Sequence, residues 1–193
     1  MKTLLYCLTF LCSLSVIDAQ TNSDETTKTY TLNLDKSVIN WRGYYLFQVG
    51  EHKGTVNFSK GELTAKNGKI TGGRFTIDMT SITNPDYEKS GNGPVAHLKN
   101  ADFFDVETHH TANLVITKVV YHPNENLHQC FADLTIKGVT LQTEFWANAN
   151  SKTKTMTTDF KIDRTRWGIV YNNKAKDHAI SDGIDFNVIL KFD

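Results

Sequence analysis

Seven histidines are the side chains of this chain that most invite a chemical role. His109 and His110 are neighbours, so in a strand they would point to opposite sides. His122 and His128 flank a turn at Pro123 and would approach each other across a hairpin. Two imidazoles without a nearby carboxylate or thiolate make at most a weak metal site. The sequence therefore favours structural or incidental histidines, and we expect neither a metal nor another cofactor.

Acid–base and nucleophilic chemistry has little support either. Asp102 and Asp105 are three residues apart, but nothing places a substrate between them. Helix capping or loop hydrogen bonding is the use that we favour for them. The sequence has no Gly-x-Ser-x-Gly elbow, no cysteine–histidine pair at a useful spacing and no glycine-rich phosphate loop. We therefore expect a protein that is not an enzyme.

Two arginines beside a tryptophan form the third candidate group. In a strand, Arg164 and Arg166 would share one face. A charged residue beside an apolar interior needs a partner, so we expect Arg164 to pair with Asp163 or Asp102. Such a pair would tie down a surface loop or orient Arg164 toward the polar headgroup of a ligand. Trp167 would then pack at the same rim.

Most of the chain after residue 30 alternates between apolar and polar side chains, which is typical of half-buried antiparallel strands. The apolar rows include Leu32 with Leu34, Phe75 with Ile77 and Met79, and the alternate residues of 130–136, 141–147 and 184–190. Turn signals separate the rows at 35–37, 60–61, 67–68, 123–124, 172–173 and 182–183. About eight strands at this short spacing predict an all-β sandwich or barrel.

Residues 84–100 interrupt this rhythm, because they carry two prolines and two glycines. We expect a loop and then a short helix that begins at about Pro94. His97 could donate a hydrogen bond to a ligand oxygen or cap its own helix, and we favour the cap. Phe103 and Phe104 follow, and burying each ring is worth roughly 1.5–3 kcal/mol. In an extended segment one ring would face the interior and the other would face the helix. Further on, Gly168 predicts a close backbone approach or a strand bend.

Three motifs occur in order along the chain: HLKNADFFD at 97–105, LTIKGVT at 134–140 and DRTRWGI at 163–169. Together they resemble the YceI-like family of periplasmic, polyisoprenoid- or lipid-binding proteins, over about residues 30–193. The resemblance implies an antiparallel, lipocalin-like β-barrel of about eight strands with a short helical lid. It also implies that the barrel encloses a long isoprenoid or fatty chain. The sequence departs from the family pattern at residues 109–111, where a Tyr-Pro pair is usual.

Alternation alone leaves open whether such a barrel is filled by side chains or hollow. The resemblance favours a cavity, and about 0.8 kcal/mol for each buried methylene favours a long hydrocarbon in it. The residues expected to contact this ligand are Trp41, Phe58, Phe75, Ile77, Leu98, Phe103, Phe104, Leu134, Ile136, Phe145, Phe160, Arg164 and Trp167.

The leading hypothesis is a binding protein that sequesters or carries an isoprenoid, quinone or fatty-acyl chain. The first alternative is a solid barrel that acts as a protein-interaction module. The second, less favoured, is a lipid-modifying enzyme. The family often forms dimers, so a homodimer stays open as a partner state.

Charge and cysteine content exclude several other classes. The 21 basic and 21 acidic residues give no net charge, so nothing favours nucleic acid or an anionic membrane surface as a partner. Cys7 and Cys12 lie in the leader, and Cys130 in a strand reads as a small buried side chain. The mature chain therefore has no internal disulfide, and its core alone must hold it together.

The first nineteen residues read as a secretory signal peptide. Lys2 precedes an apolar run over 4–17, which is shorter than the ~20 residues of a membrane span. Residues 20–29 are polar and read as a disordered lead-in, and 30–193 form a single barrel domain. We therefore expect a periplasmic or extracellular protein.

Cleavage after Ala19 makes the first testable prediction. The exported protein should begin at or near Gln20, because the short apolar run ends at a small residue that a signal peptidase accepts. Intact mass spectrometry of the exported fraction measures this directly. A full-length mass recovered from the cytosol would contradict the prediction.

Overall fold

Strands make up almost all of the computed structural model, which describes residues 26–46, 50–85, 93–171 and 179–193. The predicted signal peptide and residues 20–25 of the lead-in lie outside these residues. The disorder expected at 27–29 is wrong, because these residues belong to the first strand and pair with residues 64–66. The strands are β1 (Thr27–Thr31), β2 (Val38–Tyr45), β3 (Glu51–Lys66), β4 (Lys69–Asp78), β5 (Thr111–His122), β6 (Leu127–Ile136), β7 (Val139–Asn150), β8 (Thr155–Asp163) and β9 (Ile180–Lys191). Short helices join them: η1 (Leu34–Lys36), η3 (Met79–Ser81), α2 (Val95–Lys99) and η4 (Arg164–Trp167).

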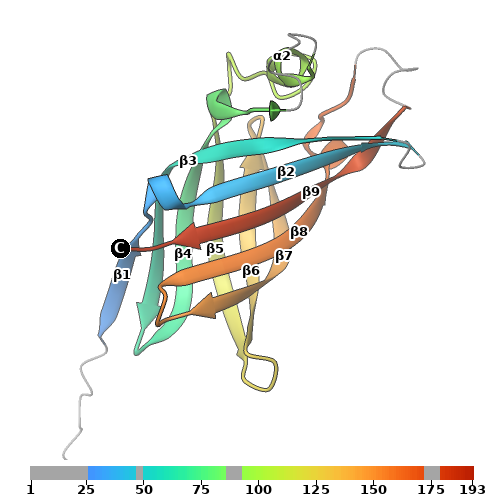
Figure 1. Ribbon diagram of the computed structural model, residues 1–193. Helices are drawn as coiled ribbons and strands as arrows, with labels where there is room; N and C mark the ends of the chain where they lie inside the picture. Colours follow the sequence, from blue (N-terminus) through green and yellow to red (C-terminus); the bar gives the residue numbers. More distant parts are fainter. Residues whose placement is uncertain (1–25, 47–49, 86–92, 172–178) are drawn as a thin grey trace, which may run out of the picture.

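Eight of these strands, β2 to β9, close into an antiparallel barrel in the order β3-β2-β9-β8-β7-β6-β5-β4 (Figure 1). Closure depends on the length of β3, which pairs with β2 through Glu51–Val56 and with β4 through Asn57–Lys66. β1 pairs with the end of β3 that β2 has left. A closed sheet has no free edge among its barrel strands. The predicted barrel of about eight strands is confirmed.

Two hairpins turn on residue pairs in the left-handed region. Asn67 and Gly68 have φ of 50° and 77°, and Lys137 and Gly138 have φ of 49° and 75°. Turns with positive φ at both central residues match the right-handed twist of the flanking strands. The turn predicted at 67–68 is therefore present, and the glycine of the LTIKGVT motif serves the β6–β7 turn.

Two other turn predictions are wrong. Gly61 lies within β3 and Gly183 lies within β9. A Cβ on Gly61 would stand 2.7 Å from side-chain carbons of both Leu32 and Phe75, so close packing explains this glycine. The expected row of Leu32 with Leu34 also fails, because Leu34 lies in η1 and is exposed. The turn expected at 172–173 lies outside the described residues.

One end of the barrel is filled by side chains. Leu32, Leu63, Ala65 and Phe192 are buried there, and a bridge pairs Leu32 with Phe192. Cys130 is fully buried in the wall, and burial raises the pKa of its thiol to about 12. It therefore behaves as the small apolar side chain that the sequence indicated.

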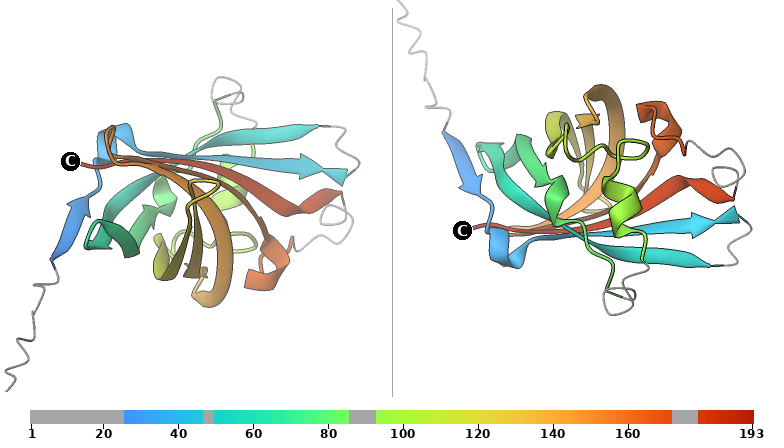
Figure 2. Two further views of the ribbon diagram at one scale, coloured as in Figure 1. Left: turned by 90° about the horizontal axis from the view of Figure 1, so that it is seen from below. Right: turned by 90° about the horizontal axis from the view of Figure 1, so that it is seen from above.

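A strap and a short helix cover the opposite end. After η3, the strap (residues 82–85) crosses β3, where the Thr83 amide donates to the Thr55 carbonyl over 2.9 Å and the Thr55 amide donates to Thr83 Oγ1 over 3.1 Å. The predicted helix after Pro94 is present as α2. Viewed from the α2 side, this helix and its flanking turns lie across the barrel (Figure 2). Within the described ranges, no helix is long and apolar enough to cross a bilayer.

The strap crossing generates a second prediction. A Cβ on Gly54 would stand 1.8 Å from the Thr83 carbonyl oxygen, a backbone atom that no rotamer change can move. Gly54→Ala should therefore lower the free energy of unfolding by about 1–3 kcal/mol. Gly43→Ala on the neighbouring strand is the matched control, because its Cβ would meet nothing within 4 Å. Urea unfolding measures both variants, and equal stabilities would contradict the close crossing.

Candidate ligand-binding cavity

The barrel is hollow beneath the strap and α2. Its cavity measures about 700 Å³, within the range of small-molecule sites. All eight barrel strands contribute lining residues, and most of these are apolar. The alternation of apolar and polar residues is also compatible with a barrel that side chains fill, but the structure contains a cavity.

A row of aromatic rings forms one wall of this cavity. Phe145, Phe160 and Phe186 lie on the adjacent strands β7, β8 and β9, with ring centroids 5.5 and 5.3 Å apart. Trp41 on β2 is the cross-strand neighbour of Phe186 and extends the row. Across the cavity, Phe58 and Phe75 stand 6.0 Å apart. The wall offers rigid apolar surface that adapts little to its contents.

Leu98 of α2 and two adjacent phenylalanines close the cavity from above. The chain turns sharply here, because the Phe103 amide donates to the Asn100 carbonyl and the Phe104 amide donates to the Leu98 carbonyl. The two rings therefore pack edge to face, with centroids 5.0 Å apart, and both line the cavity. The expectation of an extended segment with opposed rings is wrong, since turn hydrogen bonds replace strand pairing.

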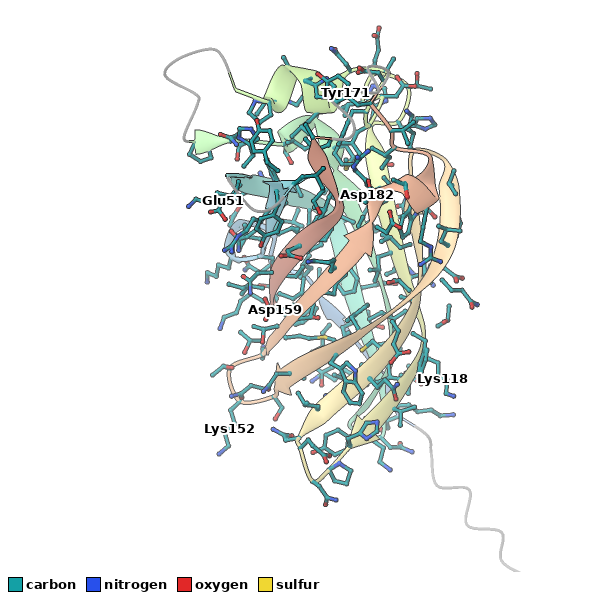
Figure 3. The ribbon with its side chains drawn as sticks, turned by 90° about the vertical axis from the view of Figure 1, so that its right-hand side faces the viewer. Glu51, Lys118, Lys152, Asp159, Tyr171 and Asp182 are labelled. Carbon is teal, nitrogen blue, oxygen red and sulfur yellow. The ribbon has the colours of Figure 1, made fainter. Side chains whose placement is uncertain are left out.

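His97 joins this lid to the connection between β8 and β9. Its ring stacks on Tyr171 with centroids 3.9 Å apart, and Nδ1 lies 3.7 Å from Asp102 Oδ1. Figure 3 places Tyr171 beside the lid and Lys152 at the opposite end of the barrel. The His97 carbonyl accepts from the Asn100 amide, as the backbone cap of α2. His97 thus links two segments far apart in sequence.

Arg164 is buried beside the cavity, where its guanidinium holds the β8–β9 connection. Nη1 donates to the Ile169 carbonyl over 2.6 Å, and Nε donates to the Ser181 carbonyl over 3.3 Å. Nη2 pairs with Asp182 over 3.1 Å. The predicted partners Asp163 and Asp102 are wrong, because residues 164–167 form η4 instead of a strand. Asp163 caps this helix, accepting from the Thr165 amide over 3.0 Å.

Trp167 does not line the cavity, unlike the other twelve residues expected to contact a ligand. Its indole is buried, and Nε1 donates to the Leu134 carbonyl over 3.1 Å. Gly168 ends η4 at φ 69°, and nothing lies within 4 Å of its Cβ position. The close approach expected at this glycine is wrong, because the left-handed backbone explains it. Through Arg164 and Trp167, the DRTRWGI motif (residues 163–169) therefore fixes the start of the β8–β9 connection to the barrel wall. We call this motif the clamp.

The twelve residues come together from six strands, the lid and η4. They are Trp41, Phe58, Phe75, Ile77, Leu98, Phe103, Phe104, Leu134, Ile136, Phe145, Phe160 and Arg164. Sequence reasoning missed several further lining residues that continue the same apolar rows, namely Ile39, Val56, Met156, Ile184, Phe186, Val188 and Leu190. The alternation could have found these. It could not have found Tyr44, Tyr45 and Tyr171, which line the cavity outside a regular row, whereas His52 continues the row of Val56 and Phe58 on β3.

The histidines considered as metal ligands have separate contacts in the structure. His122 pairs with Leu127 across the hairpin and contacts Gln129, whereas His128 packs on Tyr121. Burial lowers the pKa of His128, which favours its neutral form. Within the described part of the chain, no three histidine, cysteine, aspartate or glutamate side chains gather to hold a metal.

Comparison with known proteins agrees with the barrel. The model of the YceI-like domain matches residues 30–192. The chain belongs to the YceI-like family. YceI-like domains are barrels of a binding-protein fold that generally takes lipids or isoprenoids. A comparison with curated proteins finds no match.

Solved structures support the same fold. BcnA of Burkholderia cenocepacia is 18% identical, with a TM-score of 0.69, and the match covers 82% of this chain and 98% of that one. A YceI protein of Campylobacter jejuni is 14% identical, with a TM-score of 0.52, over 100% of this chain and 93% of that one. At these identities the likeness shows the fold alone.

The clamp generates a third prediction. Arg164→Lys should lower the free energy of unfolding by about 1–3 kcal/mol, because one ammonium cannot serve two buried carbonyls and a carboxylate in these directions. Arg166→Lys is the matched control, since Arg166 lies in the same short helix and is exposed. Thermal and urea unfolding measure both variants. Equal stabilities would show that Arg164 is dispensable to the clamp.

Proposed function

We propose that this YceI-like barrel is a binding protein that sequesters or carries an isoprenoid, quinone or fatty-acyl chain outside the cytoplasm. The observation that carries the proposal is the cavity of about 700 Å³ beneath the lid. The export signal read from residues 1–19 supports a role outside the cytoplasm.

The lining of the cavity suits a chain and not a polar metabolite. Its deep part, toward the filled end of the barrel, is built from side chains such as Ile39, Phe58 and Leu190. Thr158 also lines the cavity, but its hydroxyl donates to the Trp146 carbonyl over 2.7 Å. A bound hydrocarbon would gain roughly 0.8 kcal/mol for each methylene buried there. Several kcal/mol of lost ligand freedom oppose this, so long chains bind better than short ones.

Arg164 offers little to a ligand headgroup. Of the described residues that line the cavity, it alone carries a permanent charge. Its donors already serve Ile169, Ser181 and Asp182. Arg164 therefore acts on the ligand through the clamp, and the chain supplies most of the affinity.

Native mass spectrometry of freshly purified protein tests the proposal, followed by organic extraction and analysis of the extract. A lipid with a long apolar chain should accompany the wild type. A barrel that carries no such lipid, and takes none up after purification, would contradict the proposed function.

A cavity-filling variant makes the fourth prediction. Ala112 on β5 lines the cavity, so Ala112→Phe should occupy ligand space and abolish most of the retained lipid. Val115→Phe is the matched control, because Val115 lies on the same strand and is exposed. Lipid content per protein is measured by extraction, with thermal unfolding to confirm that both variants are folded. Undiminished lipid in folded Ala112→Phe would mean that the lipid binds elsewhere.

A further inference from the structure

The inner wall of the barrel has an open space at Gly43, near the end of β2. Gly43 alternates with Trp41 and Tyr45, and all three line the cavity, so a side chain at this position would point inward. A Cβ on Gly43 would meet nothing within 4 Å beyond its own chain neighbours, whereas a Cβ on Gly54 would collide with Thr83. The wall therefore leaves room for ligand atoms at Gly43.

A shift in the pairing of β2 with β9 borders this space on one side. Gly43 pairs with Ile184, but the register shifts before Tyr45, so three residues of β9, 181–183, oppose a single residue of β2. Extra residues of this kind bend a strand and redirect side chains, and they are frequent beside functional sites. Arg164 bonds to two of these three residues and therefore fixes the strand that borders the open space.

A hydrogen-bonded pair of polar side chains borders the space on the other side. His52 on β3 is the cross-strand neighbour of Gly43, and its Nε2 lies 2.9 Å from the Tyr45 hydroxyl. Both residues line the cavity, and Tyr45 is 38% exposed. A phenol hydroxyl that donates to an imidazole still accepts through its oxygen, and one that accepts can still donate. The Tyr45 hydroxyl can therefore serve a further partner with either tautomer of His52.

The same two strands become apolar deeper in the barrel. Ile39 and Val56 line the cavity below the strap crossing, toward the filled end. Thr158 lies at the level of Ile39, but its hydroxyl already donates to the Trp146 carbonyl. The deep part therefore suits the tail of a bound chain, and a chain held tail first brings its polar end to the level of Gly43.

We propose that the open space at Gly43 holds the headgroup of the bound chain, and that Tyr45, paired with His52, hydrogen-bonds an uncharged oxygen of this headgroup, a hydroxyl or a carbonyl. The inference rests on the proposed function and adds the chemical class of the headgroup and the residues that hold it. An uncharged oxygen fits because a carboxylate would need a countercharge. Of the described lining residues, Arg164 alone carries a permanent charge, and Asp182 engages it.

Binding of a matched pair tests the proposal: radiolabelled hexadecanol and hexadecane, titrated into protein freed of co-purified lipid. Tyr45→Phe removes the hydroxyl and keeps the ring. It should weaken hexadecanol binding about fivefold, the worth of one hydrogen bond, and leave hexadecane binding unchanged. Tyr121→Phe is the matched control and should change neither, because Tyr121 is exposed, bonds to Asn126 and lies outside the cavity lining. Equal effects of Tyr45→Phe on both ligands would overturn the proposal.

Filling the open space gives a second arm. Gly43 is not among the described glycines with positive φ, so its backbone accepts a side chain without strain. Gly43→Leu should weaken hexadecanol binding more than hexadecane binding, because a bare chain has no headgroup to place there. Thermal unfolding confirms that the variant is folded. Hexadecanol binding that survives in folded Gly43→Leu would overturn the assignment of the headgroup to this space.

Ring-proton resonances of His52 in the wild type give a measurement that does not depend on a variant. Hexadecanol should shift them further than hexadecane does, because its oxygen joins the hydrogen bond between Tyr45 and His52. Equal shifts with the two ligands would overturn the proposal, while hexadecane binding upholds the proposed function. Failure of both ligands to bind would overturn both.

Discussion

Closure of the sheet through β3 is the constraint on which the rest of the structure depends. β3 is 16 residues long, and it pairs with β2 through Glu51–Val56 and with β4 through Asn57–Lys66. Backbone hydrogen bonds around a closed barrel satisfy the polar main chain without help from the interior. The barrel can therefore keep a cavity in its interior. In a fold that is held by a packed core, a cavity of this kind would lower the stability, because contacts between side chains would be lost.

Two segments are fixed at the lid end of the hollow barrel: the strap and the β8–β9 connection. The strap crosses β3 at Gly54, where a side chain would collide with the Thr83 carbonyl oxygen. The β8–β9 connection is held by Arg164, whose buried guanidinium bonds to the carbonyls of Ile169 and Ser181. His97 stacks on Tyr171 and links the two. Hydrogen bonds of the strap and of Arg164, together with the stack of His97 on Tyr171, therefore hold the lid end of the barrel.

In the proposed binding protein, the aromatic wall would contact the ligand, whereas the buried Arg164 holds the fold. Rings such as Phe145, Phe160 and Phe186 provide apolar area of fixed shape, which rewards chain length more than chemical identity. Selection by chemistry then depends on a few polar atoms, and Arg164 is occupied by the fold.

The amino-acid sequence by itself determined the all-β class and most of the lining, because period-two alternation indicates which side chains face inward. Alternation left a sandwich open, and the family resemblance selected the barrel. The lid helix was indicated by Pro94, which suits the first turn of a helix. The sequence also indicated the Asn67–Gly68 turn, since glycine and asparagine tolerate positive φ. Only the tertiary structure decided the roles of Arg164 and Trp167. Their partners, Asp182 and Leu134, lie 18 and 33 residues away, and a local pattern carries no signal for such contacts. The cavity itself was likewise decided in three dimensions, because alternation orients side chains but does not measure the space between them.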